Sequence, residues 1–319
     1  MKYSAVLFIF ALGFSELTLA KQLSFSKQTV DNNVQFHYQW LDQNQEQQSL
    51  NFTIDKVTLF ERFRNFRSYN AQLARKYVDQ KLRQKLVQEP IAGVKIKWLS
   101  SDDNLHMELI GESQPLIDQA YQTITQLEQT LMAQHLANNF YRQFTNYDHT
   151  RAIKPDHIRF AQTSVDDLAV LKPLILNNVA VQNTRNVSNY VLSFVQSIPY
   201  NSLESRVTST GAGFNPPLQT LWQNQGDCDS KVTLSAAIFR ALMPNIKMMM
   251  VFIDNHALLA IDIPAEGDEL TITLDGTNYI LAEPTGPAIM RVGQLSEAAD
   301  FAIRNGQYYA EMFFATPQS

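Results

Sequence analysis

The chain has 319 residues, of which 45% are hydrophobic and 18% are charged, and its formal net charge is -5 at pH 7. This length is enough for one large or two ordinary globular domains with an ample core. A negative chain is poorly suited to nucleic acid or to an anionic membrane surface, because both attract basic proteins. We therefore expect no nucleic-acid partner.

The first twenty residues predict a signal peptide. Lys2 precedes an apolar run at residues 6–12, and small residues stand at Thr18 and Ala20, the spacing that a signal peptidase requires. The apolar run is shorter than the roughly 20 residues needed to cross a bilayer, and Glu16 places a charge soon after it. We expect cleavage after Ala20, no membrane span in the mature chain, and export to the periplasm or the medium.

The first mature segment predicts a pair of strands and a helix. Residues 34–40 and 50–54 alternate apolar and polar side chains, with a polar loop at 42–49 between them. Alternation of this kind is typical of half-buried antiparallel strands. An apolar stripe at helical spacing over residues 69–87 predicts a helix, which Pro90 closes.

A second hairpin and a long helix follow. Residues 94–98 and 105–109 alternate strictly on either side of the polar segment 100–104, which predicts a hairpin. Apolar residues then recur at helical spacing from residue 115 to about residue 144, so we expect one long helix there.

The polar stretch 146–166 is the predicted domain boundary. The sequence thus divides into a signal peptide (1–20), a small α+β N-terminal accessory domain (21–150) and a C-terminal domain (151–319). The overall prediction is an α+β protein.

The C-terminal domain predicts helices followed by a sheet. Residues 187–198 read as an amphipathic helix, and residues 232–243 are apolar on nearly every face until Pro244 forbids continuation, which predicts a central buried helix. Four strand-like runs separated by short turns predict an antiparallel meander. These runs are 247–253, 257–263, 270–275 and 279–282.

Cys228 is the only cysteine and stands at the start of the predicted buried helix. It has no partner for a disulfide within its chain, so in an oxidising compartment it is either inert and buried or kept for chemistry. The dipole and free N–H groups of a helix N-terminus favour the thiolate. Asp227 and Asp229 flank the thiol and predict helix capping, although their charges oppose its ionisation.

His256 and Glu283 complete a candidate triad with Cys228. His256 is the only histidine in the second half of the chain, and it opens the second strand of the meander. Glu283 ends the fourth strand, where a carboxylate can orient the imidazole, and Asp275 at another strand end competes for that role. The sequence therefore predicts a nucleophile, a base and an orienting acid.

Three motifs resemble those of the transglutaminase-like cysteine peptidase and acyltransferase superfamily. They are Gly-Asp-Cys-Asp at 226–229, Asp-Asn-His-Ala at 254–257 and Glu-Pro-Thr at 283–285, and the likeness covers about residues 170–295. It implies a papain-like C-terminal catalytic domain, with an antiparallel sheet packed on the Cys-bearing helix. The chain departs from the family pattern at Glu283, where the family usually has Asp, and in lacking the Trp that often follows His-Ala.

The resemblance implies an exported thiol enzyme that cleaves or transfers amide bonds of peptide, protein or cell-wall (peptidoglycan) substrates through an acyl-enzyme. The oxyanion is expected to be held by the Cys228 backbone N–H and by one of Trp222, Gln223 and Tyr200, which the sequence does not rank. No cofactor is expected. The histidines lack ligand spacing, so no metal site is expected either.

Two alternatives remain open at this point. The domain is a catalytically idle transglutaminase-like module that binds a peptide or protein partner, or residues 21–150 cover the cleft and hold the enzyme latent by autoinhibition. A complete triad favours the enzyme over the idle module, because a purely binding domain has no physical reason to keep it.

Overall fold

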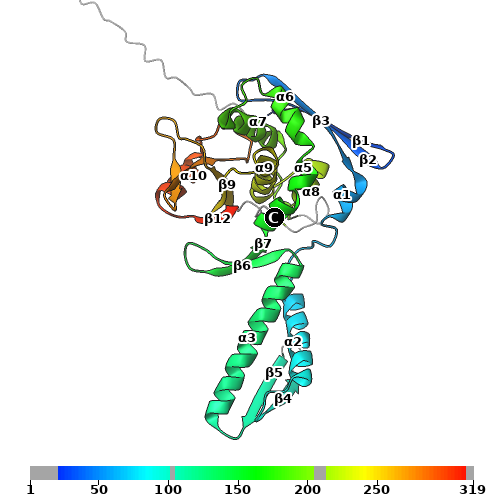
Figure 1. Cartoon of the computed structure of the whole chain (residues 1–319), viewed down its shortest axis with the longest axis vertical. Coiled ribbons are helices and arrows are strands. Elements are labelled where there is room, and N and C mark those ends of the chain that lie inside the picture. The colour runs from blue at the N-terminus through cyan, green and yellow to red at the C-terminus, as the bar shows by residue number, and fades with distance from the viewer. Residues whose placement is uncertain (1–20, 101–104, 205–212, 314–319) are drawn as a thin grey trace, which may run out of the picture.

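The protein is described from a computed structural model that covers residues 21–100, 105–204 and 213–313 (Figure 1). The fold is α+β with antiparallel sheets, as the sequence predicts. The predicted signal peptide lies outside the described residues. Within the described ranges, no helix combines the length and the apolar character needed to cross a bilayer.

The chain opens with a three-stranded antiparallel sheet of β1 (Lys21–Val30), β2 (Asn33–Leu41) and β3 (Gln47–Asp55), in that order. The two predicted strands are β2 and β3. β1 was not predicted because its side chains are mostly exposed and do not alternate cleanly. One face of the sheet is buried, through residues of β2 and β3: Val34, Phe36, Tyr38, Trp40, Leu50, Phe52 and Ile54.

This sheet packs on helices from the second half of the chain. Its buried side chains belong to the same hydrophobic cluster as those of α7 (Thr184–Ser197) and α9 (Cys228–Leu242). Tyr38 Oη donates a hydrogen bond to the Leu221 carbonyl (2.7 Å). The predicted division of the chain at residue 150 stays a prediction, but the first three strands share a core with residues that follow it.

An arm extends from the body (Figure 1). It consists of α2 (Ala71–Gln88), the hairpin of β4 (Val94–Ser100) and β5 (Leu105–Gly111), and α3 (Gln114–Asn138). A short helix, α1 (Lys56–Glu61), leads into it. The two long helices and the hairpin enclose a cluster of their own, with the buried residues Val78, Leu82, Leu86, Ile124 and Leu131.

The predicted long helix is too long by six residues. α3 ends at Asn138, Phe140 adopts a left-handed backbone (φ 61°), and the chain continues as strand β6 (Tyr141–Thr145). A left-handed residue ends a helix whatever the apolar spacing beyond it, and the apolar spacing was all that the sequence offered.

The predicted boundary stretch is folded against the body. β6 pairs with β7 (Arg151–Pro155) in a hairpin, and α4 (His157–Thr163), α5 (Val165–Leu168) and α6 (Leu171–Asn178) follow. An aromatic cluster at the root of the arm joins these pieces. Its buried members are Phe66, Leu136, Tyr141, Phe160 and Phe214.

A five-stranded antiparallel sheet forms the other half of the body, in the order β10-β11-β9-β8-β12. Its strands are β8 (Met248–Ile253), β9 (His256–Ile261), β10 (Thr271–Leu274), β11 (Thr277–Ala282) and β12 (Tyr309–Phe313). The four predicted strands are present, but they do not form the predicted meander, because β11 lies between β9 and β10. β12 was not predicted. α9 packs on one face and α10 (Glu297–Arg304) on the other. α8 (Pro217–Gln223) precedes α9.

Substitution of Trp40 tests whether the sheet of β1, β2 and β3 contributes to the core of the body. The Trp40 indole Nε1 donates to Ser193 Oγ (3.0 Å) in α7, and its side chain is fully buried. We expect Trp40→Phe to lower the free energy of unfolding by about 1–3 kcal/mol, because the substitution removes that bond and leaves a space. Urea unfolding measures it. Trp98→Phe in the half-buried hairpin of the arm is the matched control and should change less. Equal, negligible changes for both would contradict the shared core.

Candidate active site

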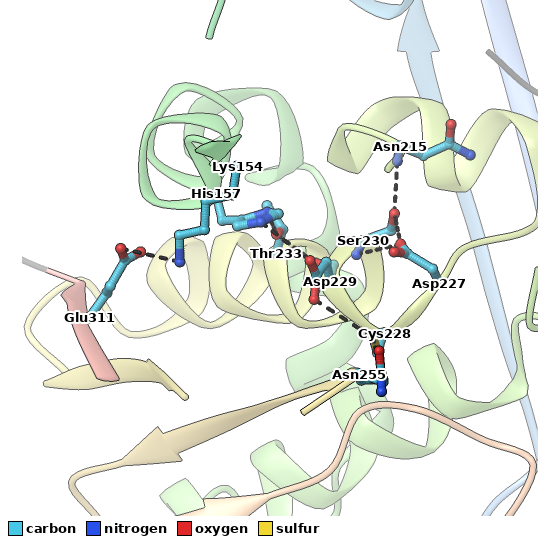
Figure 2. Close-up of polar contacts among 10 residues, drawn as sticks. All are labelled: Lys154, His157, Asn215, Asp227, Cys228, Asp229, Ser230, Thr233, Asn255 and Glu311. Atoms are coloured by element: carbon cyan, nitrogen blue, oxygen red, sulfur yellow. Dashed lines mark hydrogen bonds and ion pairs between the residues drawn. The ribbon is translucent and has the colours of Figure 1, made fainter. Parts of the chain in front are cut away.

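The N-terminus of α9 is held by a network of short polar contacts. Asp227 is the N-cap, and its Oδ1 accepts hydrogen bonds from the backbone N–H of Ser230 (2.9 Å) and from the Ser230 hydroxyl (Figure 2). The Ser230 oxygen in turn accepts the backbone N–H of Asn215 (2.8 Å). Capping by Asp227, predicted from the sequence, is confirmed, and it fixes the position of the next residue, Cys228.

Gly226 allows the chain to enter this helix. A Cβ at this position would lie 3.1 Å from both Ser230 Cβ and Thr220 Cγ2, closer than ordinary van der Waals contact. The backbone of Gly226 also pairs with the segment around Tyr200, through a hydrogen bond from its N–H to the Pro199 carbonyl (3.2 Å). A glycine is required because α8, α9 and the Tyr200 segment meet there.

Cys228 is the first residue of α9 and is 9% exposed. Its thiol donates to Asp229 Oδ1 (3.6 Å) and to the Asn255 carbonyl (3.9 Å), rather than to the imidazole of His256. Asn255 has a left-handed backbone (φ 56°), a conformation that asparagine tolerates well, and this turn directs its carbonyl toward the sulfur.

His256 and Glu283 are paired. His256 begins β9, and its Nε2 lies 2.8 Å from Glu283 Oε1. The second carboxylate oxygen, Oε2, accepts the Ser296 backbone N–H (2.9 Å), and Gln196 Nε2 donates to the Glu283 carbonyl (2.8 Å). A neutral imidazole that donates from Nε2 keeps a lone pair on Nδ1, so Nδ1 is the atom that can accept a proton.

The competing acid, Asp275, has no such role in this geometry. It lies in the exposed turn between β10 and β11, whereas the partner of His256 is Glu283. Burial alone would raise the pKa of the Glu283 carboxyl, but hydrogen bonds from His256 and Ser296 outweigh it and hold that pKa below its usual value. The group is therefore ionised at neutral pH.

Cys228 and His256 line one cavity of about 450 Å³. Of the three oxyanion candidates, Tyr200 also lines it, and Trp222 and Gln223 are not among the lining residues. The other walls are Phe144, Asn146, Lys154, Ser202, Glu204, Gly213, Asp227, Asp229, Phe252, Ile253, Asp254 and Asn255.

Trp222 and Gln223 are engaged elsewhere. Lys27 Nζ lies 3.6 Å from the centre of the Trp222 ring, and that ring packs edge-on against Phe60. Gln223 Oε1 accepts the side-chain N–H of Asn215 (2.9 Å). Adjacency to Cys228 in sequence favoured both residues, but the turn between α8 and α9 directs them away from the thiol.

The thiol is in an environment that opposes ionisation. Burial raises its pKa well above the usual value, and the carboxylates of Asp229 and then Asp227 raise it further. The Asp229 backbone N–H at the helix start lowers the pKa, as predicted, but the other effects outweigh it. Burial together with the charge of Asp229 raises the pKa of Asp227 to about 7.

Several residues of the site have no signature in the sequence. Asn255, Gln196 and Ser296 act through carbonyl, amide and backbone groups, which any residue or many residues can supply. The Asp-Asn-His-Ala motif before and at His256 is the signal that pointed near Asn255. In the part of the chain that the structure describes, no group of three or more His, Cys, Asp or Glu residues is arranged to hold a metal ion.

Comparisons with protein-family models, with curated proteins and with solved structures gave no match.

Proposed function

We propose that this protein is an exported thiol enzyme that cleaves or transfers amide bonds, with a papain-like, transglutaminase-like catalytic domain over residues 151–319. The observation that carries the proposal is the cavity that brings Cys228 to His256, with His256 paired to Glu283 at 2.8 Å. Nucleophile, base and orienting acid thus come from the starts of α9 and β9 and from the end of β11.

The catalytic cycle follows from this geometry. A substrate amide enters the cavity, the thiol turns to His256 Nδ1 and transfers its proton there, and the sulfur attacks the carbonyl carbon. The Cys228 backbone N–H and the Tyr200 hydroxyl, the oxyanion candidate that lines the cavity, stabilise the oxyanion. The protonated His256 then gives its proton to the leaving amine, and water releases the acyl group.

The substrate class is an amide of a peptide, a protein or peptidoglycan. Hydrolysis is the favoured outcome, because water is abundant. The proposal involves no cofactor.

The second candidate is an idle module that binds a peptide or protein partner in the same cavity. One observation favours it: the thiol is hydrogen-bonded to Asp229 and Asn255 in an environment that raises its pKa. In an idle module His256 would not affect the reactivity of the sulfur.

The N-terminal part of the chain forms one wall of the cavity, through Phe144 and Asn146 of the β6–β7 hairpin. Tyr147 in the same hairpin donates from its hydroxyl to Asp254 Oδ2 (2.8 Å), two residues before His256. These contacts support the proposal that residues 21–150 restrain the site.

Alkylation of Cys228 by iodoacetamide distinguishes the enzyme from the idle module. We expect the wild-type protein at pH 7 to react about tenfold faster than His256→Ala, because the base that receives the thiol proton is lost. His106→Ala, an exposed histidine of the arm, is the control and should react as the wild type does. If wild type and His256→Ala react at the same slow rate, the sulfur is not activated and the protein is the idle module.

A further inference from the structure

A second carboxylate–imidazole pair adjoins Cys228 through Asp229. Asp229 accepts the thiol hydrogen bond at Oδ1, and its Oδ2 lies 3.4 Å from Nε2 of His157 (Figure 2). His157 begins α4, is fully buried, and plays no part in the catalytic cycle described above. The Asp229 side chain is 31% exposed and lines the cavity.

Thr233 determines which nitrogen of His157 carries a proton. Its hydroxyl donates to the Asp229 backbone carbonyl (2.6 Å), which uses the only proton that the hydroxyl has. The Thr233 oxygen therefore accepts from His157 Nδ1, which lies 3.3 Å away. In a neutral imidazole the lone pair of Nε2, which has no hydrogen-bond partner among the described residues, then faces the Asp229 carboxylate across 3.4 Å, and a proton on either group removes the repulsion between their lone pairs.

The surroundings favour a single shared proton. Lys154 is the nearest cation, and its Nζ is paired with Glu311 (3.2 Å), to which Arg142 is also paired (3.2 Å). Burial raises the pKa of Asp229 and lowers the pKa of His157, so the proton is favoured on the carboxyl group. The remaining titratable groups near Asp229 are Asp227 at the N-cap and His256, which lines the same cavity.

We propose that Asp229 and His157 form a positioning pair that holds the Cys228 thiol protonated and directed away from His256 until substrate enters. The inference rests on the proposed function, since it describes how the nucleophile of that reaction is kept at rest. Asp229 acts on the reaction through Cys228, and His157 acts through Asp229.

The pair also explains how a thiolate can form beside two carboxylates. When the thiol turns toward His256, its proton moves to His256 Nδ1 and the proton shared by Asp229 and His157 stays where it is. The pair then places no net charge of its own beside the sulfur anion, because the proton shared between Asp229 Oδ2 and His157 Nε2 offsets the charge of the Asp229 carboxylate. No proton is gained or lost by the pair in this step.

The test compares the pH dependence of Cys228 alkylation by iodoacetamide in five folded proteins: the wild type, three single variants and one double variant. Asp229→Asn should move the midpoint down by about one pH unit or more, because the acceptor that holds the thiol proton is replaced by an amide that can donate a hydrogen bond to the sulfur anion. Asp227→Asn is the matched control, since it removes the other flanking carboxylate, which caps the helix and has no bond to the sulfur. It should move the midpoint less.

His157→Phe should move the midpoint in the opposite direction. A phenyl ring fits the site because the imidazole packs against Phe214 and Phe252. Without the imidazole, Asp229 faces the thiol as an unshared carboxylate and raises the midpoint. If the two residues served stability alone, the alkylation midpoints of both variants would shift in the same direction or not at all. The double variant Asp229→Asn/His157→Phe should have the same midpoint as Asp229→Asn.

Two outcomes overturn the proposal: a shift in Asp229→Asn no larger than in Asp227→Asn, or shifts of one sign in Asp229→Asn and His157→Phe. If His157→Phe does not fold, as judged by circular dichroism, the comparison of the two aspartate variants decides alone. Failure of the proposed function is separate, because it shows as an unchanged alkylation rate in His256→Ala. A slower His256→Ala with an unchanged Asp229→Asn contradicts only the positioning pair.

Discussion

Glu283→Gln should slow the acylation of Cys228 by about 10²–10⁴-fold, the range found when an orienting acid or a general base is impaired. The amide can still meet His256 Nε2, but it carries no charge to stabilise the imidazolium that forms when the thiol proton is transferred. The carboxylate is 5% exposed, so water cannot replace it. Release of p-nitrophenol from p-nitrophenyl acetate measures acylation without knowledge of the natural substrate.

Two variants sharpen this measurement. Glu283→Asp keeps the charge but shortens the side chain by one methylene, so the 2.8 Å contact with His256 is lost unless the backbone moves, and we expect an intermediate rate. Asp275→Asn removes the competing acid in the exposed β10–β11 turn and should leave the rate unchanged. A large loss in Asp275→Asn with none in Glu283→Gln would contradict the assignment of the acid.

Lys231→Met should stabilise the protein at neutral pH. Lys231 lies one turn beyond Cys228 in α9 and is fully buried, and its Nζ donates to the Ile198 carbonyl. Burial lowers its pKa to about 7, against the opposing charge of Asp227. Burial makes the charged form of this amine unfavourable in the folded protein. Its removal should therefore raise the free energy of unfolding at pH 7 by about 1–3 kcal/mol, even though one hydrogen bond is lost.

The lowered pKa of Lys231 also predicts how the free energy of unfolding changes with pH. Between about pH 7 and the usual lysine value of about 10.4, the unfolded chain binds the Lys231 proton and the folded chain does not. The free energy of unfolding therefore rises with pH across this window, by up to roughly 4–5 kcal/mol for this group alone. Urea unfolding from pH 6.5 to 9.5 should show this rise in the wild type and its loss in Lys231→Met. Lys247→Met, at an exposed lysine, is the control; a rise that persists in Lys231→Met would contradict the prediction.

The three residues of the candidate triad could be identified from the sequence because each stands at the end of a recognisable element. Cys228 precedes an apolar helix, and His256 and Glu283 bound strands that alternate or are continuously apolar. Element ends of a sheet and a helix that pack together meet at one edge, which is how three residues far apart in sequence come together. His157 could not be found this way, because it contacts Asp229 from a helix in the stretch that reads as a polar boundary.

The sequence could not distinguish among the three oxyanion candidates. Tyr200, Trp222 and Gln223 were equal on sequence, since the family resemblance allows an upstream Trp, Gln or Tyr to hold the oxyanion. Asn224 takes a left-handed backbone (φ 52°) at the end of α8, and this turn separates the direction of Trp222 and Gln223 from that of the thiol. A single backbone dihedral decides the matter, and residue type alone gives only a weak preference for it.

Strands were predictable where hydrophobic patterning and turn residues mark them, as in β8 to β11. The edge strands β1 and β12 carry no such pattern, and their pairing is set by the neighbouring strand. The packing of β2 and β3 against α7 likewise had no local signal, because patterning shows that a face is buried and not what covers it.

The lone cysteine makes the chain a single-site reporter without further engineering. Any maleimide dye, spin label or mercurial attaches at Cys228 with a stoichiometry of one, and the attached group lies in the cavity beside Tyr200 and the β6–β7 hairpin. Fluorescence quenching or heavy-atom phasing would then report on the occupied site itself. A change in the fluorescence of such a label when a peptide is added gives a direct screen for ligands of this cavity.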